Sequence, residues 1–572
     1  MIQPRKSVQN IEEYETPLFE ESYELKIDAN ENLFGCSDKV LEAIQNISRE
    51  QILKYPLYGK ITEKIADYLH ISPDCIKVTN GADEALFSLM LTYLEKDDVM
   101  LTVTPSFSMP KIYAKVVGGN VAEVPYKERW VFPSEEFFSE IKNNPDIKIV
   151  HLISPNNPTG ECLSEDLVEK ILEIAKDKLV ILDETYGSYC KSSFVNKVSE
   201  YENLVIVKSC SKDFALAGLR IGYIVTNAER IKTLKKVISP YSVNAVAAIA
   251  AEAALSDLKH LEKIKNEVKK SKEILMKGLE NLGFTVFPSD ANFVLTDVFE
   301  KKDYVYNLLI SNGIKVRNFS DEKMKTCLRI TAPQAENAQK LIEILQPKDT
   351  LIFDMDGVLV DVSSSYRTTV QKTFEYFAKE QITLDEISAA KNLGGLNNDW
   401  DLTEYLLNQK GISVDRKKLV DVFEKIYFDE GRGLISNEKF LFDKSLISQL
   451  FGRYNLCIFT GRPRKEAEFT LEKESIRKYF GEIITMDDLP SDKQKPDTLG
   501  IQKILSKILT KKVFYFGDTK DDMICGKNAG VFPIGVLPPQ DKSAALKEQL
   551  LKNGAVSVLY DINDLVKTVE SI

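Results

Sequence analysis

The residues with the clearest chemical potential are one lysine and a pair of aspartates, each placed just after a short apolar run. Lys212 lies in KSCSKDFALAGLRIGY (residues 208–223) among hydroxyl residues, with Arg220 eight residues further on. This group could supply an amine for imine formation and an anchor for a phosphate. Asp354 and Asp356 lie two residues apart in the run LIFDMDGVLVD. That spacing suits one carboxylate as nucleophile and the other as general acid, so the chain predicts two separate reaction centres.

The surroundings of the lysine have the composition of a pyridoxal phosphate site, which needs a lysine, a phosphate anchor and a carboxylate beside the pyridine nitrogen. Asp183 ends an apolar run in LVILDETYGSY, with Tyr186 following it, and Asn157 lies in the turn SPNNPTG, where it could donate to the phenolic oxygen. Phe107, in TPSFSMP, could stack on the ring. The candidate phosphate ligands are Ser209, Ser211 and Arg220, with the backbone N–H groups of Gly81, Ala82 and Asp83 where NGADEALFSLM enters a predicted helix.

Roughly residues 20 to 346 resemble the histidinol-phosphate aminotransferase family of fold-type I pyridoxal phosphate enzymes. The resemblance includes ANENLFG, YP at 55 and 56, NGADEAL, SPNNPTG, DETY, SKDFALAGLRIGY, SDANFVL, GIKVRNF and LRIT. It implies that Lys212 is the Schiff-base lysine, that Asp183 pairs with the pyridine nitrogen, and that Asn157 and Tyr186 hold the phenolic oxygen. Phe107 stands where many relatives have Tyr, which keeps the stacking and loses a hydroxyl.

The same resemblance implies a substrate subsite and a subunit contact. Arg329, with Arg317 and Asn32, is expected to bind the acidic end of the substrate, and an arginine fork suits a carboxylate and a phosphate equally. Glutamate and a phosphate ester could therefore alternate in one pocket. Tyr55 is expected to reach the cofactor phosphate of a neighbouring subunit, which implies a homodimer with shared active sites.

The second centre has the composition of a magnesium-dependent phosphotransferase site. Asp518 and Asp522, in FGDTKDDM, add carboxylates at another strand end, with Asp521 as an alternative to Asp522. Together with Asp354 and Asp356 they could hold Mg²⁺, which would screen the phosphate from the attacking carboxylate.

Two further segments complete this centre. Thr460 and the Gly461 N–H, in CIFTGRP, could bind the transferring phosphoryl group, and Lys495 could neutralise it and orient Asp354. Residues 350 to 572 resemble a phosphatase of the haloacid dehalogenase superfamily, with a helical cap in the first insertion position. The acid at position 356 favours phosphatase over dehalogenase chemistry.

Apolar runs that alternate with helical patterns predict the elements that must position these residues. KIVHLIS, LVILDE and LVIVKSC are typical of buried parallel strands, SEDLVEKILEIAKD of a crossover helix, and YNLCIFTG and KVFYFGD of strands in a second sheet. The predicted fold class is α/β, a fold-type I aminotransferase followed by a Rossmann-like phosphatase with a helical cap. QPKDT at 346–350 is the predicted linker.

The predicted boundaries place an aminotransferase over residues 1–347 and a phosphatase over 348–572. The first would have a large cofactor domain at about 35–240 and a small domain made of the N-terminus and about 245–346. The second would have its core at 349–362 and 452–572 and its cap at about 363–451.

Composition excludes several other classes. The 572 residues are 44% hydrophobic and 28% charged, with a net charge of −11, which suits a folded chain and leaves no excess of basic residues for nucleic acid. There is no signal peptide pattern and no apolar stretch long enough for a membrane span, so a cytoplasmic protein is expected. Eight scattered cysteines and three histidines favour neither disulfides nor structural zinc.

The sequence thus predicts a bifunctional enzyme of histidine biosynthesis. Its first part would exchange an amino group between histidinol phosphate and 2-oxoglutarate, giving imidazole-acetol phosphate and glutamate, and its second part would be a histidinol phosphatase. One alternative keeps both chemistries and changes the substrate to another phosphorylated amino compound, which the first part transaminates or decarboxylates. Another makes one domain a non-catalytic module, against which intact Lys212 and Asp354 argue.

Overall fold

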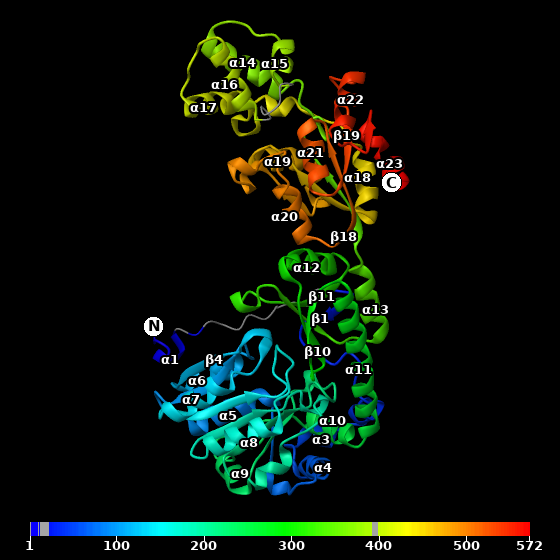
Figure 1. The fold of residues 1–572 in the computed structure, drawn as a ribbon. Helices are drawn as coiled ribbons and strands as arrows, with labels where there is room; N and C mark the ends of the chain where they lie inside the picture. The colour runs from blue at the N-terminus through cyan, green and yellow to red at the C-terminus, as the bar shows by residue number, and fades with distance from the viewer. Residues whose placement is uncertain (1, 10, 12–21, 392–397) are drawn as a thin grey trace. The chain divides into compact units, whose positions relative to one another are not determined.

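The computed structural model describes residues 2–9, 11, 22–391 and 398–572. The chain divides into two compact units, Met1–Leu345 and Gln346–Ile572, and each is described by itself (Figure 1). The mixed α/β class predicted from the sequence is confirmed in both units.

The first unit is built on a seven-stranded sheet in the order β2-β8-β7-β6-β5-β3-β4. β8 runs antiparallel to both of its neighbours, and the remaining pairs are parallel. The strands β6 and β7 are buried at every position, because helices cover both faces of a parallel sheet. The strands are β2 (Ile76–Thr79), β3 (Val99–Thr104), β4 (Asn120–Pro125), β5 (Ile147–Ile153), β6 (Leu179–Asp183), β7 (Leu204–Ser209) and β8 (Gly222–Val225).

The helices around this sheet follow the amphipathic spacing of the sequence. In α8 (Glu165–Ile174), the Ser164 side chain caps the first turn by accepting from the Leu167 N–H, and Val168, Ile171 and Leu172 are buried. The other helices are α2 (Asp38–Gln45), α3 (Arg49–Leu53), α4 (Gly59–Leu69), α5 (Gly81–Tyr93), α6 (Met109–Val117), α7 (Ser134–Asn143), α9 (Ala228–Leu234) and α10 (Ala245–Leu255), with the short α1 (Lys6–Gln9) near the N-terminus.

A second sheet of five strands completes the first unit, in the order β1-β11-β12-β10-β9. Only the β1–β11 pair is parallel, and Arg317 and Arg329 stand opposite each other on β11 and β12. The elements are β1 (Leu25–Ile27), β9 (Thr285–Phe287), β10 (Phe293–Asp297), β11 (Ile314–Asn318) and β12 (Cys327–Thr331), with α11 (Leu258–Asn281), α12 (Lys302–Ser311) and α13 (Ala335–Ile344).

The second unit contains a parallel six-stranded sheet in the order β17-β16-β13-β18-β19-β20. Its first strand begins at Lys348, which pairs with Thr510, so three of the five residues expected as a linker, 348–350, belong to the sheet. The elements are β13 (Lys348–Phe353), β16 (Asn455–Phe459), β17 (Glu482–Ile484), β18 (Thr510–Gly517), β19 (Phe532–Val536) and β20 (Ser557–Leu559), with α18 (Lys444–Arg453), α19 (Arg464–Lys473), α20 (Leu499–Lys507), α21 (Lys520–Asn528), α22 (Ala544–Lys552) and α23 (Leu565–Ser571).

The expected helical insert follows the first strand of this sheet. Four of its helices pack together: α14 (Tyr366–Ala378), α15 (Leu384–Lys391), α16 (Asp399–Gln409) and α17 (Arg416–Tyr427). Residues 392–397 of the predicted cap lie outside the described residues. The insert is entered and left through a pair of short antiparallel strands, β14 (Val360–Asp361) and β15 (Lys439–Phe440), which the sequence pattern did not indicate.

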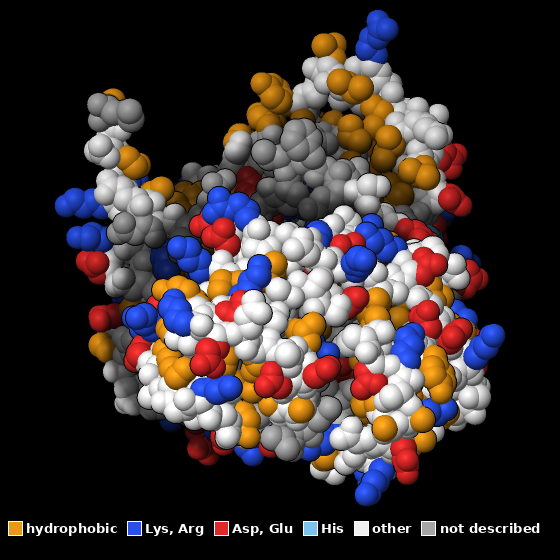
Figure 2. Space-filling model, turned by 90° about the horizontal axis from the view of Figure 1, so that it is seen from above, with side chains coloured by type: hydrophobic (Ala, Val, Ile, Leu, Met, Phe, Trp, Pro, Cys, Tyr) orange, Lys and Arg blue, Asp and Glu red, His pale blue; other side chains and the backbone are white. Residues whose placement is uncertain are grey.

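The described surface carries no sign of a membrane span. Among the described residues, no helix combines the length and the apolar character that crossing a bilayer requires. On the face seen in Figure 2, basic and acidic side chains are intermixed, with hydrophobic ones between them.

One buried side chain on β5 makes the first unit sensitive to acid. His151 is 1% exposed, burial lowers its pKa to about 3, and its Nε2 has no hydrogen-bond partner among the described residues. The imidazole therefore stays neutral in the folded state, whereas in the unfolded chain it binds a proton below the ordinary histidine pKa of about 6.5. The contribution of His151 to the free energy of unfolding is fully present above that pH. It falls by about 1.4 kcal/mol for each pH unit below it.

We expect His151→Leu to remove this dependence. Between pH 7 and pH 5, wild-type protein should lose about 2 kcal/mol more unfolding free energy than the variant, in urea titrations at the two pH values. His70→Asn, at an exposed left-handed position, is the matched control and should behave as wild type. Equal losses in wild type and His151→Leu would contradict the assignment.

Candidate active sites

Three neighbouring strand ends of the first unit open onto one cavity of about 690 Å³. Ile153 at the end of β5 pairs with Asp183 at the end of β6, and Asp183 pairs with Val207 of β7. The loops that follow these strands therefore meet, and they bring Asn157, Asp183 and Lys212 to the cavity wall.

Lys212 enters the cavity from the loop after β7. Its Nζ donates to the backbone oxygen of Ala29 at 2.9 Å. Loss of water around the amine lowers its pKa to about 8, and Arg329 and Arg220 add a smaller repulsion. At pH 7 an amine with this pKa is neutral in about one molecule in ten, far more often than an ordinary lysine, and the neutral amine is the form that acts as nucleophile or base.

Asp183 is a buried carboxylate at the base of the same cavity. It is 3% exposed, and its Oδ1 accepts from the Thr185 N–H at 2.9 Å. Burial raises its pKa to about 6, so the protein alone stabilises its charge poorly. A protonated pyridine nitrogen would supply the opposite charge, and in this respect the site fits pyridoxal phosphate.

The opposite end of the cavity has the features of a phosphate cradle. Arg220 lies 2.8 Å from Asp83 and 3.5 Å from the Ser211 hydroxyl, and the Ser211 N–H donates to Ser209 Oγ at 3.1 Å. Gly81, the first residue of α5, has φ +75°, and a Cβ there would come within 2.8 Å of Arg220. Glycine thus lets the guanidinium approach the N-terminus of the helix, where free N–H groups favour an anion.

Other predicted residues lie around this cradle. Ala82, Phe107 and Tyr186 line the cavity, and the Tyr186 hydroxyl accepts from Asn30 Nδ2 at 3.0 Å.

Two arginines of the small sheet face the remaining wall. Arg317 and Arg329 line the cavity, and Arg329 donates to Asn157 Oδ1 and to the Asp28 backbone oxygen. The contact fixes the Asn157 amide so that its nitrogen is the end that could donate to a ligand. Asn32 does not line the cavity, and its Nδ2 donates to the Lys212 backbone oxygen at 2.9 Å. It orients the loop that carries the lysine.

Tyr55 does not line the cavity of its own chain. Its side chain is 74% exposed and stacks on Tyr241, with ring centroids 4.4 Å apart. This position leaves it accessible to another molecule, as a residue that serves a neighbouring subunit would have to be.

Sequence reasoning missed a buried ion pair beneath this site. Lys208 and Glu184 lie 2.8 Å apart with both side chains almost completely buried, and Glu184 also accepts from the Ser193 hydroxyl and the Phe194 N–H. Glu184 directly follows β6 and Lys208 lies near the end of β7, but in these two segments only Asp183 and Lys212 were identified as candidates for chemistry. An acidic and a basic residue at adjacent strand ends was the available signal.

The expectation of no disulfides is wrong in one place. Cys162 and Cys190 form a disulfide, with Cα atoms 6.4 Å apart. They are 28 residues apart in the sequence and belong to the loops after β5 and β6. Strand adjacency, which cysteine spacing does not reveal, brings these loops together.

The second unit has a cavity of about 220 Å³ at the ends of β13 and β18. Asp354 is 6% exposed, and Lys495 Nζ lies 3.0 Å from its Oδ1 and 2.8 Å from Asp522 Oδ1. The two carboxylates raise the pKa of Lys495 above its ordinary value, so the ammonium stays charged. Lys495 thus contacts Asp354, the residue that it is expected to orient.

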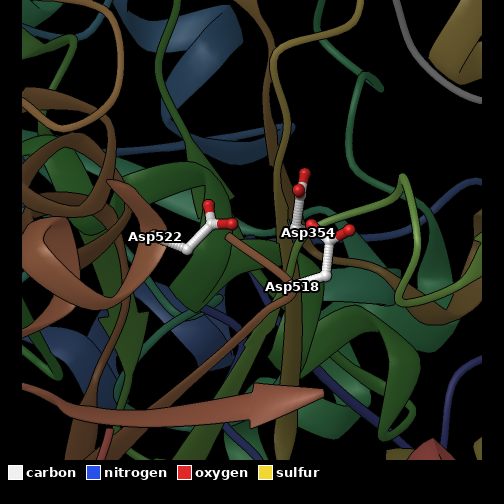
Figure 3. Close-up of side chains that lie close together, drawn as sticks. All are labelled: Asp354, Asp518 and Asp522. Atoms are coloured by element: carbon white, nitrogen blue, oxygen red, sulfur yellow. The ribbon is translucent and has the colours of Figure 1, made fainter. Parts of the chain in front are cut away.

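Asp354, Asp518 and Asp522 form the candidate metal site, with one oxygen of each within 4.8 Å of the others (Figure 3). Oxygen donors of this kind suit Mg²⁺. Gly357 has φ +72°, and a Cβ there would lie 2.2 Å from Asp518 Oδ2. Only glycine therefore lets the turn after the nucleophile pass the Asp518 carboxylate.

The adjacent acids Asp521 and Asp522, both offered by the sequence as metal ligands, have different surroundings. Asp522 accepts from the Tyr515 hydroxyl at 2.7 Å and from Thr519, besides Lys495, so its oxygens already have donors. Asp521 lines the cavity and is 7% exposed.

Asp356, which was also expected to be a metal ligand, is not one of the three grouped carboxylates. Its Oδ1 accepts from Arg462 Nε at 2.5 Å, and the Arg462 guanidinium donates to both oxygens of Glu438, at 2.9 and 3.1 Å. Arg462 is fully buried, and a buried arginine held by two acids keeps a fixed geometry. Of the predicted phosphoryl-binding residues, Gly461 lines the cavity, and the buried Thr460 Oγ1 accepts from the Arg462 N–H at 3.2 Å.

We expect Arg462→Lys to slow phosphate ester hydrolysis by about 10- to 100-fold, because lysine cannot bridge Asp356 and Glu438 and general acid catalysis depends on position. The loss should be larger for alkyl phosphates than for p-nitrophenyl phosphate, whose leaving group needs little protonation. Steady-state kinetics on both esters make the comparison. Equal losses on the two would show that Arg462 acts on folding and not on Asp356.

Two family models match the chain. Aminotransferase class I and II matches residues 24–345, and haloacid dehalogenase-like hydrolase matches residues 351–536. A histidinol-phosphate aminotransferase of Caldanaerobacter subterraneus subsp. tengcongensis is 36% identical over 330 residues, which cover 57% of this chain and 93% of that protein. One from Thermoanaerobacter pseudethanolicus is 35% identical over 346 residues, covering 60% and 96%.

Solved structures give the same result for the first unit. The histidinol-phosphate aminotransferase of Clostridium acetobutylicum is 26% identical, with a TM-score of 0.52, covering 56% of this chain and 98% of that one. The enzyme of Sinorhizobium meliloti in complex with pyridoxal-5'-phosphate, 23% identical with a TM-score of 0.51 and covering 56% and 92%, shares the fold. The chain is an enzyme that belongs to the pyridoxal phosphate-dependent class I and II aminotransferase family and carries a second domain of the haloacid dehalogenase-like hydrolases.

Proposed function

We propose that the first unit is a histidinol-phosphate aminotransferase and the second a magnesium-dependent phosphatase that acts on histidinol phosphate. The observation that carries the first half is the single cavity in which Lys212, Asp183 and Arg329 face one another, in a chain similar to enzymes of that name. The second half is supported by Asp354, Lys495 and three clustered carboxylates in the other unit.

In the first unit each residue has a separate role in amino transfer. Bound pyridoxal phosphate would accept electrons from the substrate α-carbon, with its phosphate at Arg220 and its ring nitrogen at Asp183. Arg329 and Arg317 bind the acidic end of the substrate, a carboxylate in glutamate and a phosphate in histidinol phosphate. Lys212 removes the proton from the substrate α-carbon, for which an amine pKa of about 8 is suited.

In the second unit Asp354 attacks phosphorus, an aspartyl phosphate forms, and the bond to the alcohol oxygen breaks. Asp356, held by Arg462, protonates that oxygen and then takes a proton from the water that hydrolyses the aspartyl phosphate. Asp354 and Asp518, with Asp521 or Asp522, would hold Mg²⁺, which offsets the charge of the phosphate.

The test separates the two halves by what each requires. With histidinol phosphate, 2-oxoglutarate and pyridoxal phosphate, chelation of divalent cations should stop phosphate release and leave glutamate formation unchanged. If glutamate forms but no ester is hydrolysed with Mg²⁺ present, the phosphatase assignment fails. If no glutamate forms and CO₂ is released from another phosphorylated amino acid, the first unit belongs to the alternative, decarboxylating class.

A homodimer is part of the proposal. Around Tyr55, the side chains of Ile52, Leu53 and Leu57 are 68–85% exposed, so the described part of the chain leaves this apolar surface uncovered. Sedimentation should therefore give twice the mass of the chain, and a monomeric protein with full transaminase activity would contradict a shared active site.

A further inference from the structure

The lining of the second cavity is strongly acidic. Besides Asp354, Asp356, Asp518 and Asp522, five further carboxylates line it, and only Arg367 and Lys520 join Lys495 as basic lining residues. The five are Asp399, Glu424, Glu466, Asp521 and Asp541. A phosphate ester brings two negative charges. A wall of carboxylates beside it therefore disfavours any substrate whose alcohol part carries a further negative charge.

Two of these carboxylates come close together on different elements. Glu424 of α17 and Glu466 of α19 both face the cavity, and Glu466 is 1% exposed and accepts from the Tyr366 hydroxyl. Burial and the neighbouring Glu424 raise the pKa of Glu466 to about 8. Ionising a buried acid beside a second acid is unfavourable, and a bound cation would favour the ionised form.

The nearby basic groups do not pair with every carboxylate oxygen of Glu424 and Glu466. Lys465 lies 2.6 Å from Glu424 Oε2, but Glu424 Oε1 is a buried atom without a hydrogen-bond partner among the described residues. Arg462 is held by Asp356 and Glu438. Glu424 Oε1 is therefore a buried acceptor without a donor among the described residues, and the raised pKa of Glu466 shows that the nearby basic groups do not fully offset a charge on it.

Aromatic side chains form the wall beside the pair. Tyr366, Trp400 and Phe423 line the cavity. Tyr366 stacks on Tyr427, with ring centroids 4.1 Å apart, and the Arg462 guanidinium lies 5.2 Å from its ring centroid, so Trp400 and Phe423 are the rings that could face a ligand. Carboxylates next to aromatic faces are the combination that binds organic ammonium groups, through charge-assisted hydrogen bonds and cation–π attraction.

We propose that this cavity selects phosphate monoesters whose alcohol carries a protonated amine, with Glu466 and Glu424 binding the ammonium group. The inference rests on the proposed phosphatase function and adds the residues that determine which substrate is bound. It also orders the two reactions. A keto phosphate has no ammonium group, so the second unit hydrolyses the ester efficiently only after amino transfer has supplied the amine.

The test compares histidinol phosphate with imidazole-acetol phosphate, which has a ketone in place of the amine, at pH 8 with Mg²⁺ and no amino donor. Wild type should prefer the amine at least about tenfold in kcat/KM. Glu466→Gln and Glu424→Gln should each reduce this preference by about 10-fold or more, mainly by raising KM for the amine. Glu472→Gln, exposed on the same helix, is the matched control and should keep the preference.

The outcomes separate this inference from the proposed function. Hydrolysis of both esters by wild type without preference, or a preference unchanged in both glutamine variants, overturns amine selection and leaves the phosphatase assignment intact. Hydrolysis of neither ester overturns the phosphatase assignment and amine selection with it. Because Glu466 is buried, the partly exposed Glu424 provides a second variant if Glu466→Gln folds poorly.

Discussion

Lys212→Ala is expected to lower glutamate formation from histidinol phosphate and 2-oxoglutarate by at least about 10³-fold, while phosphate release from histidinol phosphate stays at the wild-type rate. The substitution removes both the amine that forms the imine and the base that moves the α-proton. It should not unfold the chain, because it removes an amine whose lowered pKa already reports unfavourable burial. Separate assays of glutamate and of free phosphate give the two rates.

A matched control is Lys176→Ala, at an exposed position of the same unit, which should leave both rates unchanged. Restoration of glutamate formation by added methylamine would support a missing amine over a folding defect. Full glutamate formation by Lys212→Ala would refute the assignment of the lysine, whatever happens to the phosphatase.

Asp354→Asn is expected to abolish phosphate release, by about 10³-fold or more, and to leave glutamate formation intact. Asparagine has nearly the same size but cannot form an aspartyl phosphate by direct attack. Lys495 keeps Asp522 as a partner in the variant, so the loss should not come from an unpaired buried ammonium group. Phosphate release with Mg²⁺ present, measured beside the transaminase rate, decides the point.

Asp385→Asn, exposed in the first turn of α15, is the control and should behave as wild type in both assays. Retained phosphate release in Asp354→Asn would contradict the nucleophile. Loss of both activities would instead indicate that the substitution disrupts the whole chain.

Sequence patterns could predict the residues that follow buried strands. Asp183, Lys212 and Asp354 were identified because a short apolar run before each one predicts a strand, and the ends of adjacent parallel strands meet at one edge of the sheet. The helical insert was predicted for a similar reason, since its amphipathic spacing differs from that of the strands on either side.

The parts that escaped prediction depend on which side chains meet across the fold. Arg462 was passed over within its own motif, because its partner Glu438 is 24 residues away and leaves no local signal. Asn32 was expected at the substrate but contacts the backbone beside Lys212, 180 residues away. Sequence spacing identifies candidate groups near a strand end, whereas the pairing of buried charges depends on tertiary distances that spacing does not contain.

The central claim is that one chain performs two consecutive reactions on one phosphorylated amino alcohol. The most direct test gives the purified protein imidazole-acetol phosphate, pyridoxal phosphate and Mg²⁺, adds glutamate last, and follows 2-oxoglutarate and free phosphate over time. We predict little phosphate before glutamate is added, and afterwards 2-oxoglutarate first with phosphate following at matching yield. Rapid phosphate release before glutamate is added, or 2-oxoglutarate without any phosphate, would contradict the account.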